Sequence, residues 1–384
     1  MTTTAHHDRR RAWAYLSRVV EGPCAPLTAL VVEHGPEPVM RAIRDRGALP
    51  NVVRTRTESR HHLDSSANDL ELLRSLGGRL ITPDDDDWPA WRMLPFTGAA
   101  ASGVHDAHAP LALWVLGNAS LGAVTERAVA IVGTRAASSY GEHVTAELSH
   151  ELAADGWTIT SGAAYGIDGA AHRAALGAGG STVAVLACGV DRCYPSGHGA
   201  LIRQIARQGL VISEYPPGTT PAKHRFLARN RLVAALSDGV VVVEAGWRSG
   251  ARSTATWARN LGLPVMAVPG PVTALSSAGC HRMVRTREAT LVTSAAEVVE
   301  EVGRIGELAP QLPLGIAEHR PTDGLDTVAG QVHGALPASG GASERQLAQT
   351  SGIAIDDVRG ALPMLEMEGL ARLAEDGWHR VVRR

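Results

Sequence analysis

Residues 129–135 have the sequence Val-Ala-Ile-Val-Gly-Thr-Arg, and a helix is predicted to begin shortly afterwards, at Gly141. The apolar, β-branched run predicts a buried strand, because such residues suit a pleated surface that is covered on both sides. The glycine and the small residues after it predict a tight turn. A strand, a short turn and a helix in this order form the repeating unit of α/β sheets.

The same unit recurs along the centre of the chain. Further strands are predicted at 111–116, 157–160, 182–187, 210–213, 240–243, 265–268 and 290–292. Helices are predicted at 141–154, 169–176, 201–207, 230–236 and 254–261. This alternation predicts an α/β fold with a doubly wound, mostly parallel sheet that is covered by helices on both faces. Ligands of such sheets bind at the carboxyl ends of the strands.

The region before the sheet has a different character. Residues 1–10 are polar and predict a disordered leader. Residues 11–76 predict a small helical domain, either a packing module or a helix-hairpin-helix that touches DNA. The central domain is expected over 77–303, with a surface loop at 97–110 because that stretch lacks periodicity.

A linker of low hydrophobicity is expected over 304–324, followed by a last domain over 325–384. Two helices and a hairpin are predicted there, which is the order of elements in a winged-helix domain. Its second helix has a net charge of −3, from Asp356, Asp357, Arg359, Glu366 and Glu368. DNA repels such a helix, so this domain is expected to contact protein.

The composition limits the classes of function. The chain has 384 residues, of which 45% are hydrophobic and 20% charged, so it can form a sizeable core. The net charge is −2, so any surface for nucleic acid must be local. Four scattered cysteines favour a reduced, cytoplasmic protein. Neither a signal peptide nor a membrane-spanning segment is expected, because no apolar run reaches about 18 residues.

Three predicted turns at the carboxyl edge of the sheet contain small residues that suit a phosphate group. They are Gly133-Thr134-Arg135, Ser161-Gly162 and Ser249-Gly250. Backbone N–H groups at such turns bind anions, and an arginine adds a charge that can bind in a bidentate manner.

Two acidic positions near these turns have alternative interpretations. Asp168 and His172 share a helix face and could form an acid–base pair. We favour structural roles, in which Asp168 lies at the helix start and His172 hydrogen-bonds locally, because no nucleophile is nearby. Glu244 ends a strand, where it could act as an acid, accept hydrogen bonds from loop N–H groups or pair with an arginine.

A basic segment follows the fourth strand of the central series. Residues 221–260 contain seven Lys or Arg against two acidic residues, a local balance of +5. The segment begins with Lys223-His224-Arg225-Phe226, and Lys223 is the only lysine of the chain. Cations that follow phosphates and a ring that stacks on a base are what a single strand requires. The alternative is a solvated basic face with Phe226 in the core.

The order of these short motifs resembles the DNA-processing protein A (DprA, or Smf) family over about residues 111–302. The motifs are Ile-Val-Gly-Thr-Arg, Ser-Gly-Ala-x-x-Gly-Ile-Asp, Ile-Ser-Glu-Tyr-Pro-Pro-Gly, Phe-x-x-Arg-Asn-Arg, Val-Glu-Ala and Val-Pro-Gly. Tyr165 departs from the pattern, because the family usually has arginine there. The resemblance implies a Rossmann-like domain that binds single-stranded DNA, forms a homodimer and loads a RecA-type recombinase in natural transformation.

The resemblance also implies roles for individual residues. Arg135 would contact phosphate, and Lys223 and Phe226 would lie in a loop that enters the DNA pocket. Arg229 and Arg231 would line or brace the pocket. The helical module (SAM-like or helix-hairpin-helix-like) and the winged-helix tail would be accessories.

We therefore expect a non-catalytic, single-strand-specific DNA-binding protein of competence that acts as a recombination mediator, without cofactor or metal. The expected DNA-binding residues are Gly133, Thr134, Arg135, Ser161, Gly162, Lys223, Arg225, Phe226, Arg229, Asn230, Arg231, Ser249 and Gly250. The alternative is a nucleotide-processing enzyme, similar to nucleoside monophosphate phosphoribohydrolases, on a related scaffold. The Pro-Gly-Gly-x-Gly-Thr-x-x-Glu loop of those enzymes is missing, because Pro269-Gly270-Pro271 diverges from it at once.

Overall fold

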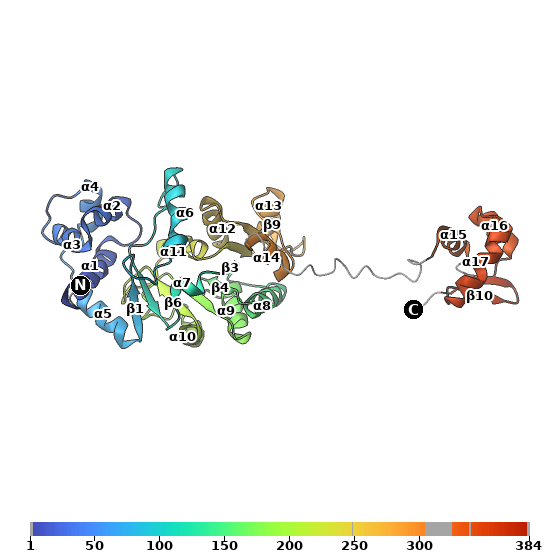
Figure 1. Ribbon diagram of the computed structural model, residues 1–384, viewed down its shortest axis with the longest axis horizontal. Helices are drawn as coiled ribbons and strands as arrows, with labels where there is room; N and C mark the ends of the chain where they lie inside the picture. The colour runs from blue at the N-terminus through green and yellow to red at the C-terminus, as the bar shows by residue number, and fades with distance from the viewer. Residues whose placement is uncertain (1–2, 248, 304–324, 338, 382–384) are drawn as a thin grey trace. The chain divides into compact units, whose positions relative to one another are not determined.

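The computed structural model describes residues 3–247, 249–303, 325–337 and 339–381. Contacts group the chain into two compact units, Met1–Pro310 and Gln311–Arg384. Each unit is described by itself (Figure 1). The linker predicted over 304–324 lies outside the described residues.

A nine-stranded sheet organises the first unit. Its order is β1-β2-β6-β5-β4-β3-β7-β8-β9, and the seven strands from β6 to β9 are parallel, whereas β2 pairs antiparallel with β1 and β6. The strands are β1 (Gly78–Ile81), β2 (Leu113–Leu116), β3 (Ala128–Val132), β4 (Thr158–Ser161), β5 (Thr182–Leu186), β6 (Leu210–Ser213), β7 (Gly239–Val242), β8 (Val265–Ala267) and β9 (Thr290–Leu291). The predicted α/β fold with a mostly parallel sheet is confirmed.

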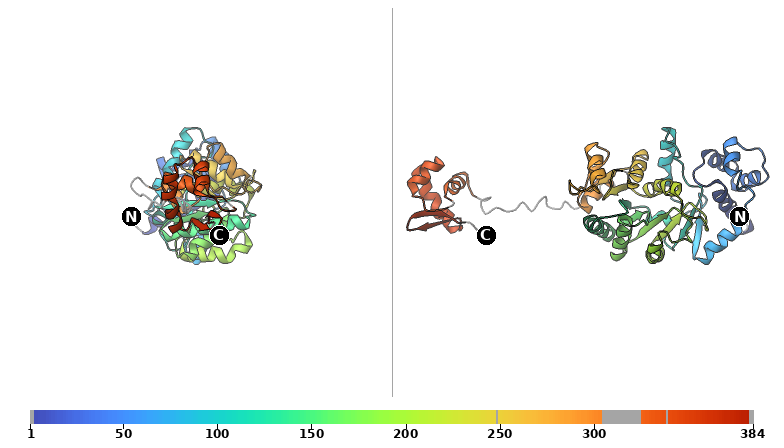
Figure 2. Two further views of the ribbon diagram at one scale, coloured as in Figure 1. Left: turned by 90° about the vertical axis from the view of Figure 1, so that its right-hand side faces the viewer. Right: turned by 180° about the vertical axis from the view of Figure 1, so that it is seen from behind.

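Helices cover both faces of this sheet (Figures 1 and 2). The helices of the central region are α6 (Ala90–Ala101), α7 (Leu121–Val124), α8 (Ser139–Ala154), α9 (Ile167–Gly177), α10 (Gly199–Gln208), α11 (Lys223–Ala235), α12 (Ala251–Asn260), α13 (Ala278–Arg285) and α14 (Ala295–Val302). The predicted surface loop at 97–110 is wrong for its first five residues, because α6 continues to Ala101.

Alternate residues of one strand belong to different cores. Val183 and Val185 of β5 pack with residues of α6, α11, α12 and α13, whereas Ala184 and Leu186 pack with residues of α10. Burial of each such Val or Leu side chain contributes roughly 1.5–3 kcal/mol. Because both faces are covered, central strands such as β3 and β7 contain only apolar residues and glycine.

The order of the strands places a crevice between β3 and β7. After β3 the chain adds β4, β5 and β6 on one side, and it then returns to β7 on the other side of β3. The loops after β3 and β7 therefore separate from each other at this switch point. A crevice at the carboxyl ends of such strands is where ligands of open α/β sheets bind.

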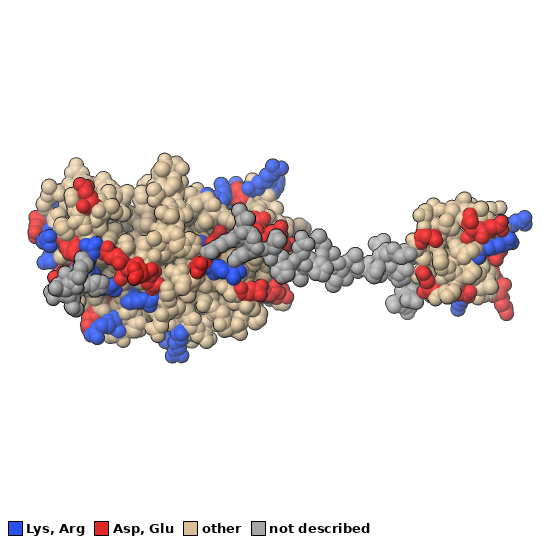
Figure 3. Space-filling view, viewed as in Figure 1, with Lys and Arg blue, Asp and Glu red and all other residues tan. Residues whose placement is uncertain are grey.

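Five helices precede β1, namely α1 (Thr3–Val20), α2 (Ala25–His34), α3 (Pro36–Arg44), α4 (Asn51–Thr57) and α5 (Ser66–Ser75). The predicted disordered leader is wrong for residues 3–10, which form the start of α1. Its polar pattern is explained by ion pairs, because Arg9 makes two 2.8 Å hydrogen bonds to Asp84 and Arg10 pairs with Asp85. Lys or Arg and Asp or Glu side chains are interspersed over this part of the molecule (Figure 3).

The N-terminal helices share their core with the edge of the sheet. Tyr15 and Leu16 of α1 belong to the same buried cluster as Trp114 of β2 and Val211 of β6, and all four are fully buried. The boundary predicted between residues 76 and 77 therefore passes through one continuous core. None of the helices in the described ranges has both the length and the apolar composition needed to cross a membrane.

The described residues of the second unit form three helices and a hairpin. They are α15 (Thr327–Ala335), α16 (Glu344–Ser351), α17 (Ile355–Met367), β10 (Ala371–Ala374) and β11 (Gly377–Arg380). The sequence predicted all of these except α15. A capping box of Ser343 and Gln346 begins α16, and Gly352 ends it in a left-handed conformation, which glycine adopts without strain. The winged-helix assignment of this unit stays a prediction.

Candidate nucleic-acid interface

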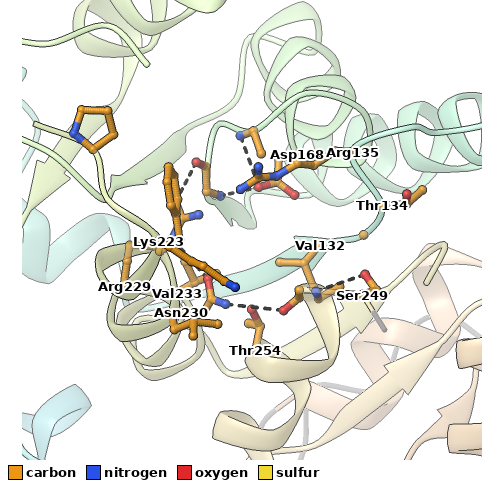
Figure 4. A pocket seen from close by; sticks show the side chains of 18 of the residues that line it. Val132, Thr134, Arg135, Asp168, Lys223, Arg229, Asn230, Val233, Ser249 and Thr254 are labelled. Carbon is orange, nitrogen blue, oxygen red and sulfur yellow. Dashed lines mark hydrogen bonds between the residues drawn. The ribbon is translucent and has the colours of Figure 1, made fainter. Parts of the chain in front are cut away.

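A cavity of about 830 Å³ lies at the carboxyl ends of β3 and β7. This size is within the roughly 300–1,000 Å³ of typical ligand sites. Side chains of α11 line one side, and Ser249 and Thr254 project from the region where α12 begins (Figure 4). Ten of the thirteen expected residues line it: Gly133, Thr134, Arg135, Gly162, Lys223, Phe226, Arg229, Asn230, Ser249 and Gly250.

Hydrogen bonds from two sides hold the loop after β3 in place. The Thr134 N–H donates to the carbonyl of Glu244 at 2.7 Å, and the Thr134 carbonyl accepts from the N–H of Ile167 at 3.2 Å. Gly166 has a φ of +74°, and a Cβ there would overlap the carbonyl of Thr134. Glycine is therefore required for the close approach of the two loops. The result is a rigid base from which the exposed Arg135 side chain projects.

Carboxylates accept hydrogen bonds from N–H groups at the predicted Ser161-Gly162 turn and at the start of the helix that follows the Gly133-Thr134-Arg135 turn. Asp168 Oδ2 accepts hydrogen bonds from the N–H groups of Gly162 and Ala164 at 3.2 and 3.3 Å. Glu244 accepts from the N–H and the hydroxyl of Ser138, which caps α8. The structural interpretations of Asp168 and Glu244 are confirmed. These three N–H groups are therefore not free to bind a phosphate group.

His172 does not form an acid–base pair with Asp168. Its Nδ1 lies 2.7 Å from Thr182 Oγ1, whose hydroxyl donates to the carbonyl of Ile159. Complete burial lowers the pKa of His172 to about 3, so the ring is neutral near neutral pH. Burial also raises the pKa of Asp168, although Arg229 and the two N–H groups act in the opposite direction.

Arg229 is a buried structural cation. Its guanidinium donates to the carbonyl of Gly162 at 2.6 Å and to the carbonyl of Val185, so it joins the ends of β4 and β5. Burial lowers the pKa of Arg229, and the nearby Asp168 opposes this shift. A Cβ at position 162 would lie 2.5 Å from Arg229 Cζ, so only glycine leaves room for the guanidinium.

Two other cations of the cavity are available to a ligand. Arg135 and Lys223 are exposed, and neither has a carboxylate partner within the described residues. Among the described residues, the cavity lining contains three cationic side chains, Arg135, Lys223 and Arg229, against the single carboxylate of Asp168. The field inside the cavity is therefore positive although the whole chain is slightly negative.

The Phe226 ring contacts both the Arg135 guanidinium and the Tyr194 ring. The Arg135 Cζ lies 5.1 Å from the centroid of the Phe226 ring, and the Tyr194 ring centroid lies 5.4 Å from that of Phe226. We call these three side chains the Arg–Phe–Tyr stack. The sequence singled out the first two but missed Tyr194, although its place at the end of a loop beside Pro195 was visible. The stack combines a guanidinium group that can bind phosphate with two aromatic rings on which a base can stack.

The basic segment is helical from its first residue. Lys223 and Phe226 begin α11, so the prediction that they lie in a loop is wrong. Positions 223, 226 and 230 share one helix face because they are three and four residues apart, and this face lines the cavity. The Asn230 side chain donates to the carbonyl of Gly250 at 3.4 Å and links α11 to the loop before α12.

The other three expected residues do not line the cavity. Ser161 is buried and donates to the carbonyl of Ile131 at 2.6 Å. Arg231 is buried in an ion pair with Glu214 at 2.6 Å. Arg225 is absent from the cavity lining and pairs with Glu21 at 2.6 Å.

Glu21 connects the N-terminal helices to the helix that lines the cavity. Its carboxylate also pairs with Arg60 and lies 3.1 Å from His224 Nε2. Burial opposes ionisation of Glu21, but hydrogen bonds from Arg225 and Arg60 outweigh it and lower the pKa to about 2. The backbone of Glu21 is in the left-handed region with a φ of +42°, a conformation that disfavours a side chain. The two arginines hold the carboxylate despite this strain.

Tyr165 contacts a neighbouring turn and does not line the cavity. Its hydroxyl accepts a hydrogen bond from the N–H of Gly197 at 3.2 Å, and its ring packs edge-on against His198 at 4.8 Å. It therefore supports the turn that follows Tyr194.

Comparison with known proteins gives consistent matches. The family described as DNA recombination-mediator protein A matches residues 79–303. The DprA homologue of Mycobacterium tuberculosis strain H37Rv is 53% identical over 376 residues, which are 97% of this chain and 94% of the relative. The X-ray structure of DNA processing protein A from Streptococcus pneumoniae superposes with a TM-score of 0.61 and 31% identity, over 79% of this chain and 99% of that chain. A Helicobacter pylori structure, described as showing how DNA processing protein A binds single-stranded DNA, is 34% identical over 50% of this chain and 86% of that chain, with a TM-score of 0.46.

Proposed function

The chain belongs to the DNA recombination-mediator protein A family, and we propose that it binds single-stranded DNA in the cavity at the carboxyl ends of β3 and β7. One observation carries this proposal. Arg135 and Lys223, which have no carboxylate partner among the described residues, line the same cavity as the Phe226 and Tyr194 rings of the Arg–Phe–Tyr stack. The cations bind phosphates of the strand, and the rings stack on its bases.

The shape of the cavity favours a single strand over a duplex. Its rings, those of Phe226 and Tyr194, line a recess. The bases of a duplex are stacked on one another, whereas those of a single strand are free to stack on protein rings. Salt-dependent affinity should therefore be higher for a single-stranded oligonucleotide than for a duplex, and equal affinity would contradict the proposal.

Lys223 offers a direct test because it is the only lysine of the chain. Acylation of its ε-amino group, followed by mass spectrometry, reports on a single side chain inside the cavity. A single-stranded oligonucleotide should slow this acylation, whereas acylation of the N-terminal amine serves as the internal control. Unchanged acylation of Lys223 with saturating strand would refute binding in this cavity.

The alternative is hydrolysis of a nucleotide in the same cavity. A hydrolase needs a group that activates water, but the carboxylate of Asp168 already accepts two backbone hydrogen bonds and lies beside Arg229. This arrangement favours binding without catalysis. Release of free base from a nucleoside monophosphate by the purified protein would support the alternative.

We further propose that the protein is a cytoplasmic homodimer that loads a RecA-type recombinase on incoming DNA in natural transformation. The family membership and the mycobacterial relative support this role. Addition of the protein should accelerate the assembly of a RecA-type filament on a strand covered by single-strand-binding protein. Light scattering during size-exclusion chromatography tests the dimer. A monomer, or an unchanged assembly rate, would contradict the respective statement.

For the second unit we propose a winged-helix fold that contacts protein. The order of α16, α17 and the β10–β11 hairpin supports the fold, and the net charge of −3 on and beside α17 disfavours DNA. Neutralisation by Asp356→Asn and Glu366→Gln should leave strand affinity unchanged and weaken recombinase capture. A marked rise in duplex affinity with normal capture would contradict this role.

A further inference from the structure

An exposed tryptophan stands immediately beside the cavity. Trp247 follows Gly246, which lines the cavity, and its side chain is 58% exposed. Consecutive Cα atoms are only about 3.8 Å apart, so a strand that leaves the cavity at Gly246 meets Trp247 next. An indole that is more than half exposed is uncommon in a structural role, because tryptophan is among the most buried side chains on average.

Two arginines contact Trp247, one at its ring and one at its backbone. The Arg282 Cζ lies 4.9 Å from the centroid of the Trp247 ring, and the Arg252 side chain donates to the carbonyl of Trp247 at 3.0 Å. Neither arginine has a carboxylate partner within the described ranges. An aromatic ring with nearby unpaired guanidinium groups is the combination that binds a base together with its phosphate.

The backbone beneath Trp247 is held firmly. The N–H of Gly279, in the first turn of α13, donates to the carbonyl of Ala245 at 2.7 Å, and a Cβ at Gly279 would overlap that carbonyl. The N–H of Ser249 donates to the carbonyl of Gly246 at 3.2 Å. These hydrogen bonds hold the backbone on both sides of Trp247, at Ala245 and Gly246 and at Ser249, which is what a stacking platform requires.

From these contacts we infer that Trp247, Arg252 and Arg282 form a second nucleotide subsite, outside the cavity, for the base and phosphate next along the strand. This inference rests on the proposed function, because it extends the path of the same single strand. Exposed Val272 and Leu275 lie on the loop before α13, so a protein partner at this place is the competing outcome.

Oligonucleotides of two lengths distinguish binding at the subsite from binding in the cavity. A strand of about 4 nucleotides engages the cavity, and one of roughly 16 nucleotides, the long end of known site sizes, engages both. Trp247→Ala should weaken binding of the long strand about 5- to 150-fold, as expected for one stacked base, and leave the short strand unaffected. Trp247→Phe should keep most of the affinity. Quenching of tryptophan emission by the long strand should be largely lost in Trp247→Phe.

Trp91→Ala is the matched control, because Trp91 is 41% exposed on α6 and lies outside the cavity lining. Both strands should bind this variant as they bind the wild type. Wild-type affinity of Trp247→Ala for the long strand would overturn the subsite, and so would a change of oligomeric state without a change of strand affinity. Wild-type binding by Arg135→Gln/Lys223→Gln would instead show that the proposed function has failed.

Discussion

Neutralisation of the two unpaired cations tests the proposed strand binding through its dependence on salt. Each cation that pairs with a phosphate releases counterions, so the slope of log affinity against log salt changes by about 0.7 per contact for a single strand. In the proposed complex Arg135 and Lys223, which both line the cavity, supply two such contacts. The double variant Arg135→Gln/Lys223→Gln should therefore have a slope shallower by about 1.4. A fourfold rise in salt should then weaken the wild type by about sevenfold more than the variant.

Fluorescence anisotropy of a labelled oligodeoxythymidylate, titrated at several sodium chloride concentrations, measures this slope. Arg203→Gln is the matched control, because Arg203 is exposed on α10 and does not line the cavity. It should keep the wild-type slope. A double variant with the wild-type slope would show that these cations do not contact phosphates, and the reasoning would be refuted.

Three predictions concern stability, measured by urea unfolding. Gly162→Ala should lower the free energy of unfolding by about 1–3 kcal/mol through overpacking, because the buried Arg229 guanidinium cannot move without losing its carbonyl partners. Gly177→Ala is the control and should not destabilise the protein, because no atom lies within 4 Å of the new Cβ. Glu21→Gln should lower the free energy of unfolding near neutral pH, because the pKa of Glu21 in the folded protein is about 2, below its ordinary value of 4.5. The ionised carboxylate therefore stabilises the fold fully above pH 4.5, and this contribution is lost as the pH falls towards 2. The variant and the wild type should have similar stability at that pH. Arg231→Ala should cost about 3–5 kcal/mol, because it leaves a buried carboxylate unpaired; a loss of strand affinity at unchanged stability would contradict this structural role.

Much of the sheet could be predicted because central strands such as β3 and β7 contain only apolar residues and glycine. The prediction for 210–213 coincides with β6, and the strand predicted at 129–132 differs from β3 by one residue. The start of α11 was missed because Lys223-His224-Arg225 has no apolar periodicity. Tertiary contacts hold this first turn, in particular the ion pair between Arg225 and Glu21, which is 204 residues away in the sequence. Local patterns contain no signal of such a contact.

The candidate site was predicted better than the roles of its charges. Small residues after β3 and β7 marked the cavity because ligands of open α/β sheets bind in the crevice where those two loops diverge. The local charge of +5 could not distinguish solvent-facing Lys223 from buried Arg231, since both lie on α11 and only the packing of its faces separates them. Likewise, small turns suggested free amide groups, but Asp168, six residues beyond Gly162, already accepts their hydrogen bonds.

The core that α1 shares with the edge of the sheet determines where the chain can be shortened. A protein that begins at residue 79, where the family match starts, keeps Trp114 and Val211 but lacks the Tyr15 and Leu16 that belong to the same buried cluster. Its edge would present an apolar surface to water, and exposed surfaces of this kind promote aggregation. In evolutionary terms, the N-terminal helices and the sheet must change together, because a substitution on one side of this interface alters the packing on the other.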